Sequence, residues 1–219
     1  MVIIDYKKQY HKQIIAAAAK ALKQGKAVAY PTDTSYGLAV DAGNIKAVKK
    51  LYKIKGRNFN KPVHVVVPSI AYGKKIARWN PAASKLAKKF WPGALTLVLP
   101  VGKGLDPSLQ KPIRQLSANT GTIGLRMPKN KIAMDLAKHL GRPITATSAN
   151  LSGQPDCYSA DDIIRQFRNQ THHPDIIINA GKLSKRKPST LVSVSGNAIK
   201  ILRQGPISEK QIIKTAFSN

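Results

Sequence analysis

The chain contains little cysteine and few acidic residues. Its 219 residues include one cysteine, Cys157, and 10 aspartates and glutamates. One cysteine excludes an internal disulfide and a cysteine-rich metal site, and the scarcity of acids argues against a hydrolase that works with two carboxylates. The chain also lacks any run of about 18 apolar residues, and its first residues lack the basic and apolar regions of a signal peptide. We therefore expect a cytoplasmic protein with no membrane segment.

Several familiar catalytic and nucleotide-binding motifs are also missing. The sequence has no Gly-x-x-x-x-Gly-Lys-Ser/Thr loop and no Gly-x-Gly-x-x-Gly, so any nucleotide is held without either common cradle. The five histidines show neither zincin spacing nor the order of a Ser-His-Asp hydrolase. Cys157 has no candidate base nearby, which indicates an inert thiol.

Positive charge is abundant. There are 37 lysines and arginines, which give a formal net charge of +27, and they are spread from Lys7 to Lys214. Such an excess attracts anions, and RNA, DNA and nucleotide phosphates are the natural partners. A solvated basic surface without a partner explains the same composition, because charge bears on solubility and binding rather than on fold.

Strand and helix patterns interleave without alternating strictly, which favours one α/β domain over residues 1–219 with a twisted, mixed open sheet and flanking helices. The predicted helices cover residues 11–24, 44–55, 81–90, 130–140, 160–168 and 207–216. The predicted strands cover residues 26–30, 63–67, 95–99, 122–126, 143–147, 175–179, 190–194 and 198–202. Two polar stretches, 102–120 and 182–189, are predicted to be loops, the first of them mobile.

The most informative motif is Ser148–Gly153, with the sequence SANLSG. It follows a predicted buried strand that ends in a polar turn. Hydroxyls, an amide and a glycine make a poor core, but at a strand end of an α/β sheet they suit a ligand site.

Two further motifs place polar residues at the ends of predicted elements. Tyr30–Leu38 brings three hydroxyl residues and a carboxylate between a proline and a glycine, which suits either a small polar ligand or a turn without one. Lys55-Gly56-Arg57, followed by Lys61, places three cations after a helix. They can hold a triphosphate, or they can simply complement the helix dipole.

Arginines close two apolar strands. Arg126 ends a strand within Thr122–Pro128, where burial is costly unless its guanidinium meets an anion, either a substrate carboxylate or an internal aspartate such as Asp33. Lys187–Val192 and Arg203 repeat the combination of hydroxyls and cations. We interpret Trp91–Leu99 as a rigid turn that leads into a core strand.

Taken in this order, the motifs resemble the YrdC-type threonylcarbamoyl-AMP synthases of tRNA modification, over about residues 10–205. The resemblance implies a twisted α/β sheet with a large basic concave face, in the short form that holds the catalytic domain alone. It also implies a nucleotidyltransferase that makes threonylcarbamoyl-adenylate and pyrophosphate from L-threonine, bicarbonate and ATP, with a magnesium ion. A partner enzyme then transfers the threonylcarbamoyl group to the adenosine beside the anticodon of tRNA.

The resemblance assigns roles by position. The catalytic Lys-x-Arg and Ser-x-Asn residues, at the nucleotide, are Lys55, Arg57, Ser148 and Asn150. Further ATP contacts are Lys61, Thr122 and Arg203. The L-threonine contacts are Thr34, Arg126 and Ser189, with Arg126 as partner of the carboxylate.

Two positions depart from the family pattern. Many relatives have a histidine where this chain has Val66, and the nearest histidine is His64. Many relatives have asparagine where this chain has Lys61. Three alternatives remain at this stage: a double-stranded RNA or tRNA-binding module of the same fold without synthase activity, a paralogous branch without robust activity, and a small-molecule phosphotransferase. The threonine positions argue against the first, the intact Lys-x-Arg and Ser-x-Asn pairs against the second, and the lack of a catalytic carboxylate against the third.

Overall fold

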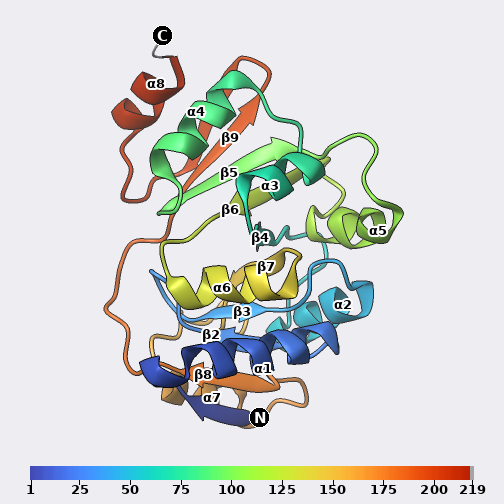
Figure 1. The fold of residues 1–219 in the computed structure, drawn as a ribbon, viewed down its shortest axis with the longest axis vertical. Helices are drawn as coiled ribbons and strands as arrows, with labels where there is room; N and C mark the ends of the chain where they lie inside the picture. Colours follow the sequence, from blue (N-terminus) through green and yellow to red (C-terminus); the bar gives the residue numbers. More distant parts are fainter. Residues whose placement is uncertain (218–219) are drawn as a thin grey trace.

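The computed structural model describes residues 1–217, whose strands form one ten-stranded mixed sheet in the order β1-β8-β2-β3-β7-β4-β6-β5-β9-β10 (Figure 1). The strands are β1 (Val2–Asp5), β2 (Val28–Tyr30), β3 (Gly37–Ala39), β4 (His64–Val66), β5 (Leu95–Pro100), β6 (Thr122–Arg126), β7 (Ile144–Ser148), β8 (Ile176–Asn179), β9 (Thr190–Ser195) and β10 (Ala198–Arg203). Parallel and antiparallel neighbours both occur, which confirms the predicted mixed α/β sheet.

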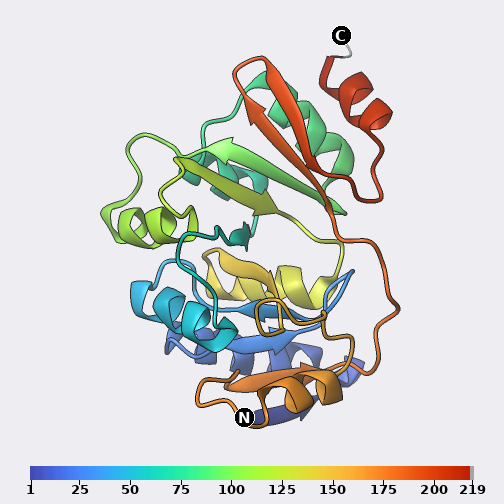
Figure 2. The same ribbon diagram turned by 180° about the vertical axis from the view of Figure 1, so that it is seen from behind.

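Helices cover both faces of the sheet. They are α1 (His11–Lys23), α2 (Ile45–Lys55), α3 (Ile70–Ile76), α4 (Pro81–Phe90), α5 (Pro107–Leu116), α6 (Lys131–Leu140), α7 (Ala160–Phe167) and α8 (Glu209–Phe217), with a 3₁₀ turn at Lys8–Tyr10. Figure 1 shows α1 and α6 side by side in front of the lower strands, and Figure 2 shows α2 and α7 on the opposite face. None of the helices in residues 1–217 is long and apolar enough to cross a membrane.

Strand β7 joins the two halves of the sheet. On one side it runs antiparallel to β3, with Ser148 opposite Gly37, and on the other it runs antiparallel to β4, with Ala146 opposite His64. Both contacts are short, and the strands twist strongly between the lower and upper halves in Figure 1. The loops that follow β2, β6, β7 and β10 consequently meet at one place.

The helix that leads to the predicted Lys-x-Arg element has clear ends. The side chain of Asn44 caps α2 by accepting hydrogen bonds from the backbone of Lys46 and Ala47 at 3.0 and 3.2 Å. The helix stops at Gly56, whose φ of 55° lies in the left-handed region that glycine adopts at little cost. The left-handed turn at Gly56 ends the helix there, so Arg57 leaves the helix axis.

The predicted elements are found within two residues of their expected ends. Two strands, β1 and β3, two α-helices, α3 and α5, and the 3₁₀ turn at Lys8–Tyr10 were not predicted. The prediction that 102–120 is a mobile loop is wrong over Pro107–Leu116, which form α5. Asp106 caps this helix by accepting from the backbone of Ser108 at 2.8 Å, and Ile113 is fully buried in the core. Segment 182–189 has no regular secondary structure, as expected.

Because α5 is packed and not a loose loop, Ile113→Ala should reduce the free energy of unfolding by about 2–5 kcal/mol, the usual cost of a cavity left by a buried isoleucine. Urea denaturation monitored by circular dichroism measures the loss. Lys111→Ala, at an exposed position of the same helix, should change stability by less than about 0.5 kcal/mol. Equal stability of Ile113→Ala and the wild type would show that α5 does not contribute to the core.

Candidate functional site

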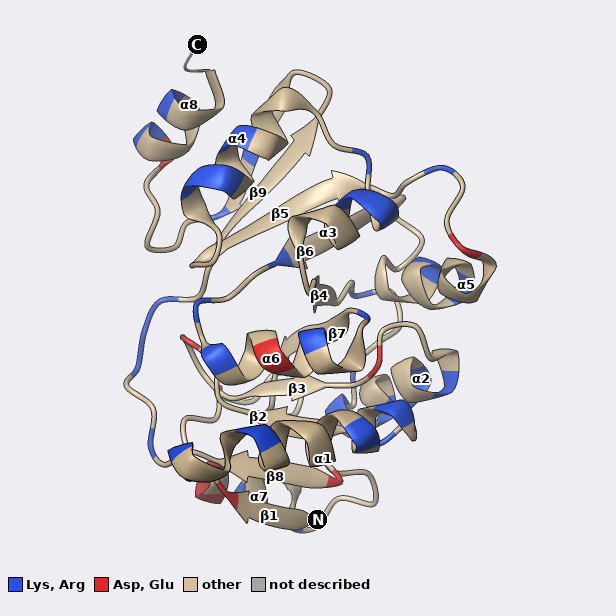
Figure 3. Cartoon of the chain, viewed as in Figure 1, with Lys and Arg blue, Asp and Glu red and all other residues tan. Residues whose placement is uncertain are grey.

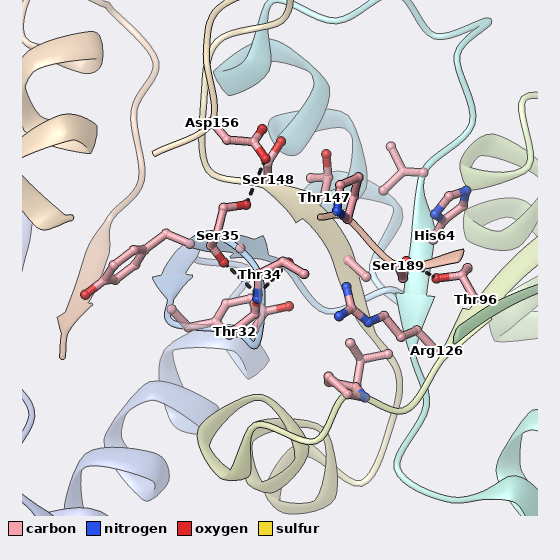
Figure 4. A pocket seen from close by; sticks show the side chains of 18 of the residues that line it. Thr32, Thr34, Ser35, His64, Thr96, Arg126, Thr147, Ser148, Asp156 and Ser189 are labelled. Atoms are coloured by element: carbon pink, nitrogen blue, oxygen red, sulfur yellow. Dashed lines mark hydrogen bonds between the residues drawn. The ribbon is translucent and has the colours of Figure 1, made fainter. Parts of the chain in front are cut away.

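A cavity of about 310 Å³ lies where the two halves of the sheet meet. Its walls come from the loop after β2, from Arg57 and 62–63 after α2, from β4, β5 and β6, from the end of β7 and Asp156 beyond it, from 188–189, and from the end of β10. Figure 4 shows side chains from these segments converging on the same space. Of the predicted site residues, those that line it are Thr34, Arg57, Arg126, Ser148, Ser189 and Arg203.

Arg57 reaches the cavity from the end of α2. Its Nε donates to the carbonyl of Lys61 at 3.4 Å, and one Nη donates to the carbonyl of Pro62 at 3.0 Å. These two contacts fix one edge of the guanidinium. A guanidinium carries five donors, so others remain for an anion in the cavity.

Arg203, at the end of β10, is fixed in a similar way. Its Nε and Nη2 donate to the carbonyl of Ser189 at 3.2 and 3.0 Å. The Ser189 hydroxyl is hydrogen-bonded to that of Thr96 at 2.8 Å, a contact that Figure 4 marks. Burial, and to a smaller extent the nearby Arg126, lower the pKa of Arg203. The cavity thus holds this cation at a cost that an anionic ligand would relieve.

Arg126 forms an ion pair with Asp33 of the loop after β2. This resolves one choice that the sequence left open, since an internal aspartate does meet this arginine. The pairing is incomplete, because Arg126 Nε is buried and has no hydrogen-bond partner within residues 1–217. A buried donor without an acceptor costs about 1–3 kcal/mol, so an acceptor placed at the Nε of Arg126 would be stabilised there.

The loop after β2 carries the remaining hydroxyls. The Thr32 hydroxyl donates to the carbonyl of Ser35 at 2.6 Å and accepts from the backbone of Thr34 at 3.0 Å. This is a turn closed by its own side chain. The turn presents Thr34 to the cavity. The motif is therefore a closed turn that also lines a possible ligand site.

His64 lies on β4 and also lines the cavity. Its ring packs against Gly124, where an added Cβ would come within 2.3 Å of the ring. Burial, together with charge repulsion from Arg203, Arg57 and Arg126, lowers the pKa of His64 to about 4. The imidazole is therefore neutral at pH 7. Val66, two residues along the strand, lines the same cavity because alternate residues of a strand face the same side.

Lys55 and Asn150 do not line the cavity and lie behind it. Lys55 is 2% exposed, and its ammonium donates to the carbonyl of Ser148 at 2.5 Å and to the carbonyl of Asn150 at 2.8 Å. Burial, together with repulsion from Arg57, lowers the pKa of Lys55 to about 8. Lys61 and Thr122 also lie outside the cavity walls, Lys61 with an exposed side chain.

Polar residues that line the cavity but had no role assigned from the sequence include His64, Thr96 and Asp156. His64 and Thr96 lie in apolar strands, and only the alternation of each strand indicates which face they occupy. Asp156 accepts a hydrogen bond from Ser35 at 3.0 Å (Figure 4). No group of three or more histidine, cysteine or acidic side chains that could hold a metal occurs among residues 1–217.

Known proteins share this architecture. A family model for the Sua5, YciO and YrdC proteins, described as telomere recombination, matches residues 20–205. The chain is 36% identical over 199 residues to the threonylcarbamoyl-AMP synthase of Bacillus subtilis. The match covers 90% of this chain and 55% of that protein.

Solved structures agree with this result. The chain matches Sua5 of Pyrococcus abyssi complexed with L-threonine with a TM-score of 0.87 and 32% identity, over 100% of this chain and 61% of that chain. It matches YciO of Escherichia coli with a TM-score of 0.77 and 25% identity, over 96% of this chain and 97% of the YciO chain. The chain thus spans less than two thirds of the Bacillus and Pyrococcus proteins. With the matched family model, these similarities establish that the chain belongs to the Sua5/YciO/YrdC family.

Proposed function

We propose that this chain makes threonylcarbamoyl-adenylate and pyrophosphate from L-threonine, bicarbonate and ATP. The observation that carries the proposal is the cavity in which Arg57, Arg126 and Arg203 converge from three separate segments. Three cations around one hollow suit a ligand set that brings a triphosphate and a carboxylate together. The Bacillus relative is named a threonylcarbamoyl-AMP synthase, and the Pyrococcus relative was solved with L-threonine.

The cavity divides between the two substrates. Arg57, Ser148 and Arg203 are proposed to hold the phosphates of ATP, while Thr34, Arg126 and Ser189 hold L-threonine. Lys61 and Thr122, outside the cavity walls, are assigned to parts of the nucleotide that extend beyond the cavity.

Charge and placement supply the catalysis. The amine of threonine and bicarbonate give a carbamate and water, and a carbamate oxygen then attacks the α-phosphorus of ATP while pyrophosphate leaves. Both reactants are anions, so their approach is the main electrostatic barrier. Fixed guanidiniums stabilise the charge that develops at phosphorus, and alignment of the two substrates lowers the barrier further.

Magnesium is proposed to enter with ATP. Mg²⁺ is typically held by one or two carboxylates together with substrate phosphates. Asp156 is the one carboxylate residue among the cavity-lining residues in 1–217, and Ser35 occupies one of its oxygens. The site therefore fits a cation that arrives on the nucleotide, which neutralises phosphate charge.

The product requires a second enzyme. Threonylcarbamoyl-adenylate is a reactive mixed anhydride, and we assign its consumption to enzymes that transfer the threonylcarbamoyl group to tRNA in the cytoplasm. An RNA-binding module without synthase activity is less favoured. Lysines and arginines are spread over most of the helices and several loops (Figure 3), so the net charge does not indicate one RNA surface. A module that only binds RNA also has no need of a buried arginine such as Arg126, whose Nε has no hydrogen-bond partner within residues 1–217.

The direct test is incubation with ATP, magnesium and bicarbonate, with and without L-threonine, followed by detection of pyrophosphate and the adenylate. Threonine-dependent release of pyrophosphate is expected. Arg57→Ala should raise the barrier by about 2–4 kcal/mol, the scale of one lost donor to a developing charge. Arg168→Ala, at an exposed position beyond α7, is the matched control and should retain full activity. Absence of threonine-dependent pyrophosphate with the wild type refutes the proposal.

Arg126 is expected to bind the carboxylate of threonine. Arg126→Gln should raise KM for L-threonine about 10- to 100-fold, since a hydrogen bond to a charged group contributes about 1.5–3 kcal/mol, and should leave KM for ATP nearly unchanged. Because this variant also leaves Asp33 without its partner, the double variant with Asp33→Asn is measured alongside. If the double variant recovers the wild-type KM, Arg126 serves only to neutralise Asp33.

The lowered pKa of His64 should affect the acid stability of the protein. The pKa of His64 is lower in the folded state than in the unfolded state, so its contribution is present above about pH 6.5 and is lost as the pH falls toward 4. His64→Gln should lose about 2–3 kcal/mol less stability than the wild type between these pH values. Urea titrations across the range measure the difference. Parallel curves would place His64 in contact with water.

A further inference from the structure

Lys55 is a buried cation that the proposed reaction leaves without a role. It is the last residue of α2 and is 2% exposed, whereas Arg57, two residues later, lines the cavity. The left-handed turn at Gly56 separates the two, so one side chain points inward and the other toward the ligand space.

All three donors of the Lys55 ammonium are in use. They reach the carbonyl of Ser148 at 2.5 Å, the carbonyl of Asn150 at 2.8 Å and the side-chain oxygen of Asn150 at 3.0 Å. A lysine ammonium has three N–H groups and no more. A phosphate could gain a contact from Lys55 only by displacing one of these acceptors.

The acceptors belong to one turn, Ser148–Gly153, which is held at several further points. The Ser148 hydroxyl donates to the side-chain oxygen of Asn150 at 2.5 Å, and the amide nitrogen of Asn150 donates to the carbonyl of Gln154 at 2.5 Å. The backbone of Ser152 donates to the carbonyl of Lys55 at 2.8 Å. Both the side chain and the backbone of Lys55 therefore form hydrogen bonds with the turn.

The charge of Lys55 is balanced by oxygen dipoles. Among residues 1–217, no carboxylate forms a salt bridge with it, although Asp156 favours its charged form from a longer range. A buried charge with no counterion is tolerated when its hydrogen bonds are complete, as they are here. The turn and the ammonium are thus mutually dependent, since removing the ammonium takes a donor from the carbonyls of Ser148 and Asn150 and leaves the side-chain oxygen of Asn150 with only the Ser148 hydroxyl.

We propose that Lys55 is a positioning residue that assembles the Ser148–Gly153 turn and presents Ser148 to the cavity, and that it does not contact the phosphates of ATP. In each of the Lys-x-Arg and Ser-x-Asn pairs, one residue then lines the cavity and the other is buried behind it. Arg57 and Ser148 face the ligand, and Lys55 and Asn150 hold them from behind. The kinetic consequence of this assignment rests on the proposed function, whereas its structural consequence does not.

The structural test uses the protein without substrates at pH 7. Lys55→Met keeps the length of the side chain and removes the donors, and the backbone amide of Ser152 should then exchange with solvent at least tenfold faster, as measured by hydrogen exchange. Lys53→Met, at an exposed position on the same helix, should leave that rate unchanged. An unchanged rate in Lys55→Met overturns the proposal.

Wild-type protein supplies a test that survives if Lys55→Met fails to fold. The Lys55 side chain should give a slowly exchanging ammonium resonance in ¹⁵N NMR spectra of the free protein, and its chemical shift should not move when ATP is added. A scalar coupling between Lys55 Nζ and a phosphorus atom of ATP would overturn the proposal.

A double-mutant cycle separates positioning from direct contact. If Lys55 acts through Ser148, Lys55→Met should lower kcat/KM for ATP about tenfold or more alone, and much less in a Ser148→Ala background. If Lys55 contacts phosphate itself, the two losses should multiply, which contradicts the proposal. Should the wild type make no adenylate, the proposed function fails, while the exchange and NMR results still decide the role of Lys55.

Discussion

Three guanidinium groups share one small cavity, and the rest of the site depends on how their repulsion is contained. Each is tied to an acceptor that the fold holds in place: Arg57 to backbone carbonyls of its own loop, Arg203 to the carbonyl of Ser189, and Arg126 to Asp33. These contacts fix the cations before any ligand arrives. A preorganised set of donors stabilises a developing charge without the reorganisation that water would require.

The sheet topology explains why the cations meet. Because β7 pairs with β3 on one side and β4 on the other, strand ends from both halves open onto the same hollow. The motif after β7 therefore faces the loop after β2, which carries Asp33 and Thr34. Behind this surface, Lys55 ties the end of α2 to the turn after β7. The functional residues thus lie on short loops, but each loop is anchored to a buried element.

Much of this arrangement could be predicted from the sequence, and the exceptions have physical causes. The Asn80-Pro81 start of α4 and the strand that ends at Arg126 follow from local chemistry, a cap in one case and an apolar run in the other. Helix α5 was missed because two prolines, including Pro112 in its interior, masked its apolar spacing. Strand β3 has three residues, too few for alternation to show.

The site itself divides in the same way. Hydroxyls and arginines at the ends of apolar strands are unusual in a protein core. Arg126, Ser148 and Arg203 could therefore be predicted as site residues from the sequence. The direction in which a side chain points could not be deduced at Lys55, because a lysine beside a loop gives no sign whether its ammonium faces solvent or a buried turn. His64 was similarly hidden, since its burial among three arginines arises from segments far apart in the chain.

The most direct test of the account is a crystal structure with a non-hydrolysable ATP analogue and L-threonine bound together. Phosphate oxygens should lie within hydrogen-bond distance of Arg57 and Arg203, and the threonine carboxylate should lie on Arg126, in the same cavity. Phosphates bound elsewhere on the surface, with these three guanidiniums left facing solvent, would contradict it.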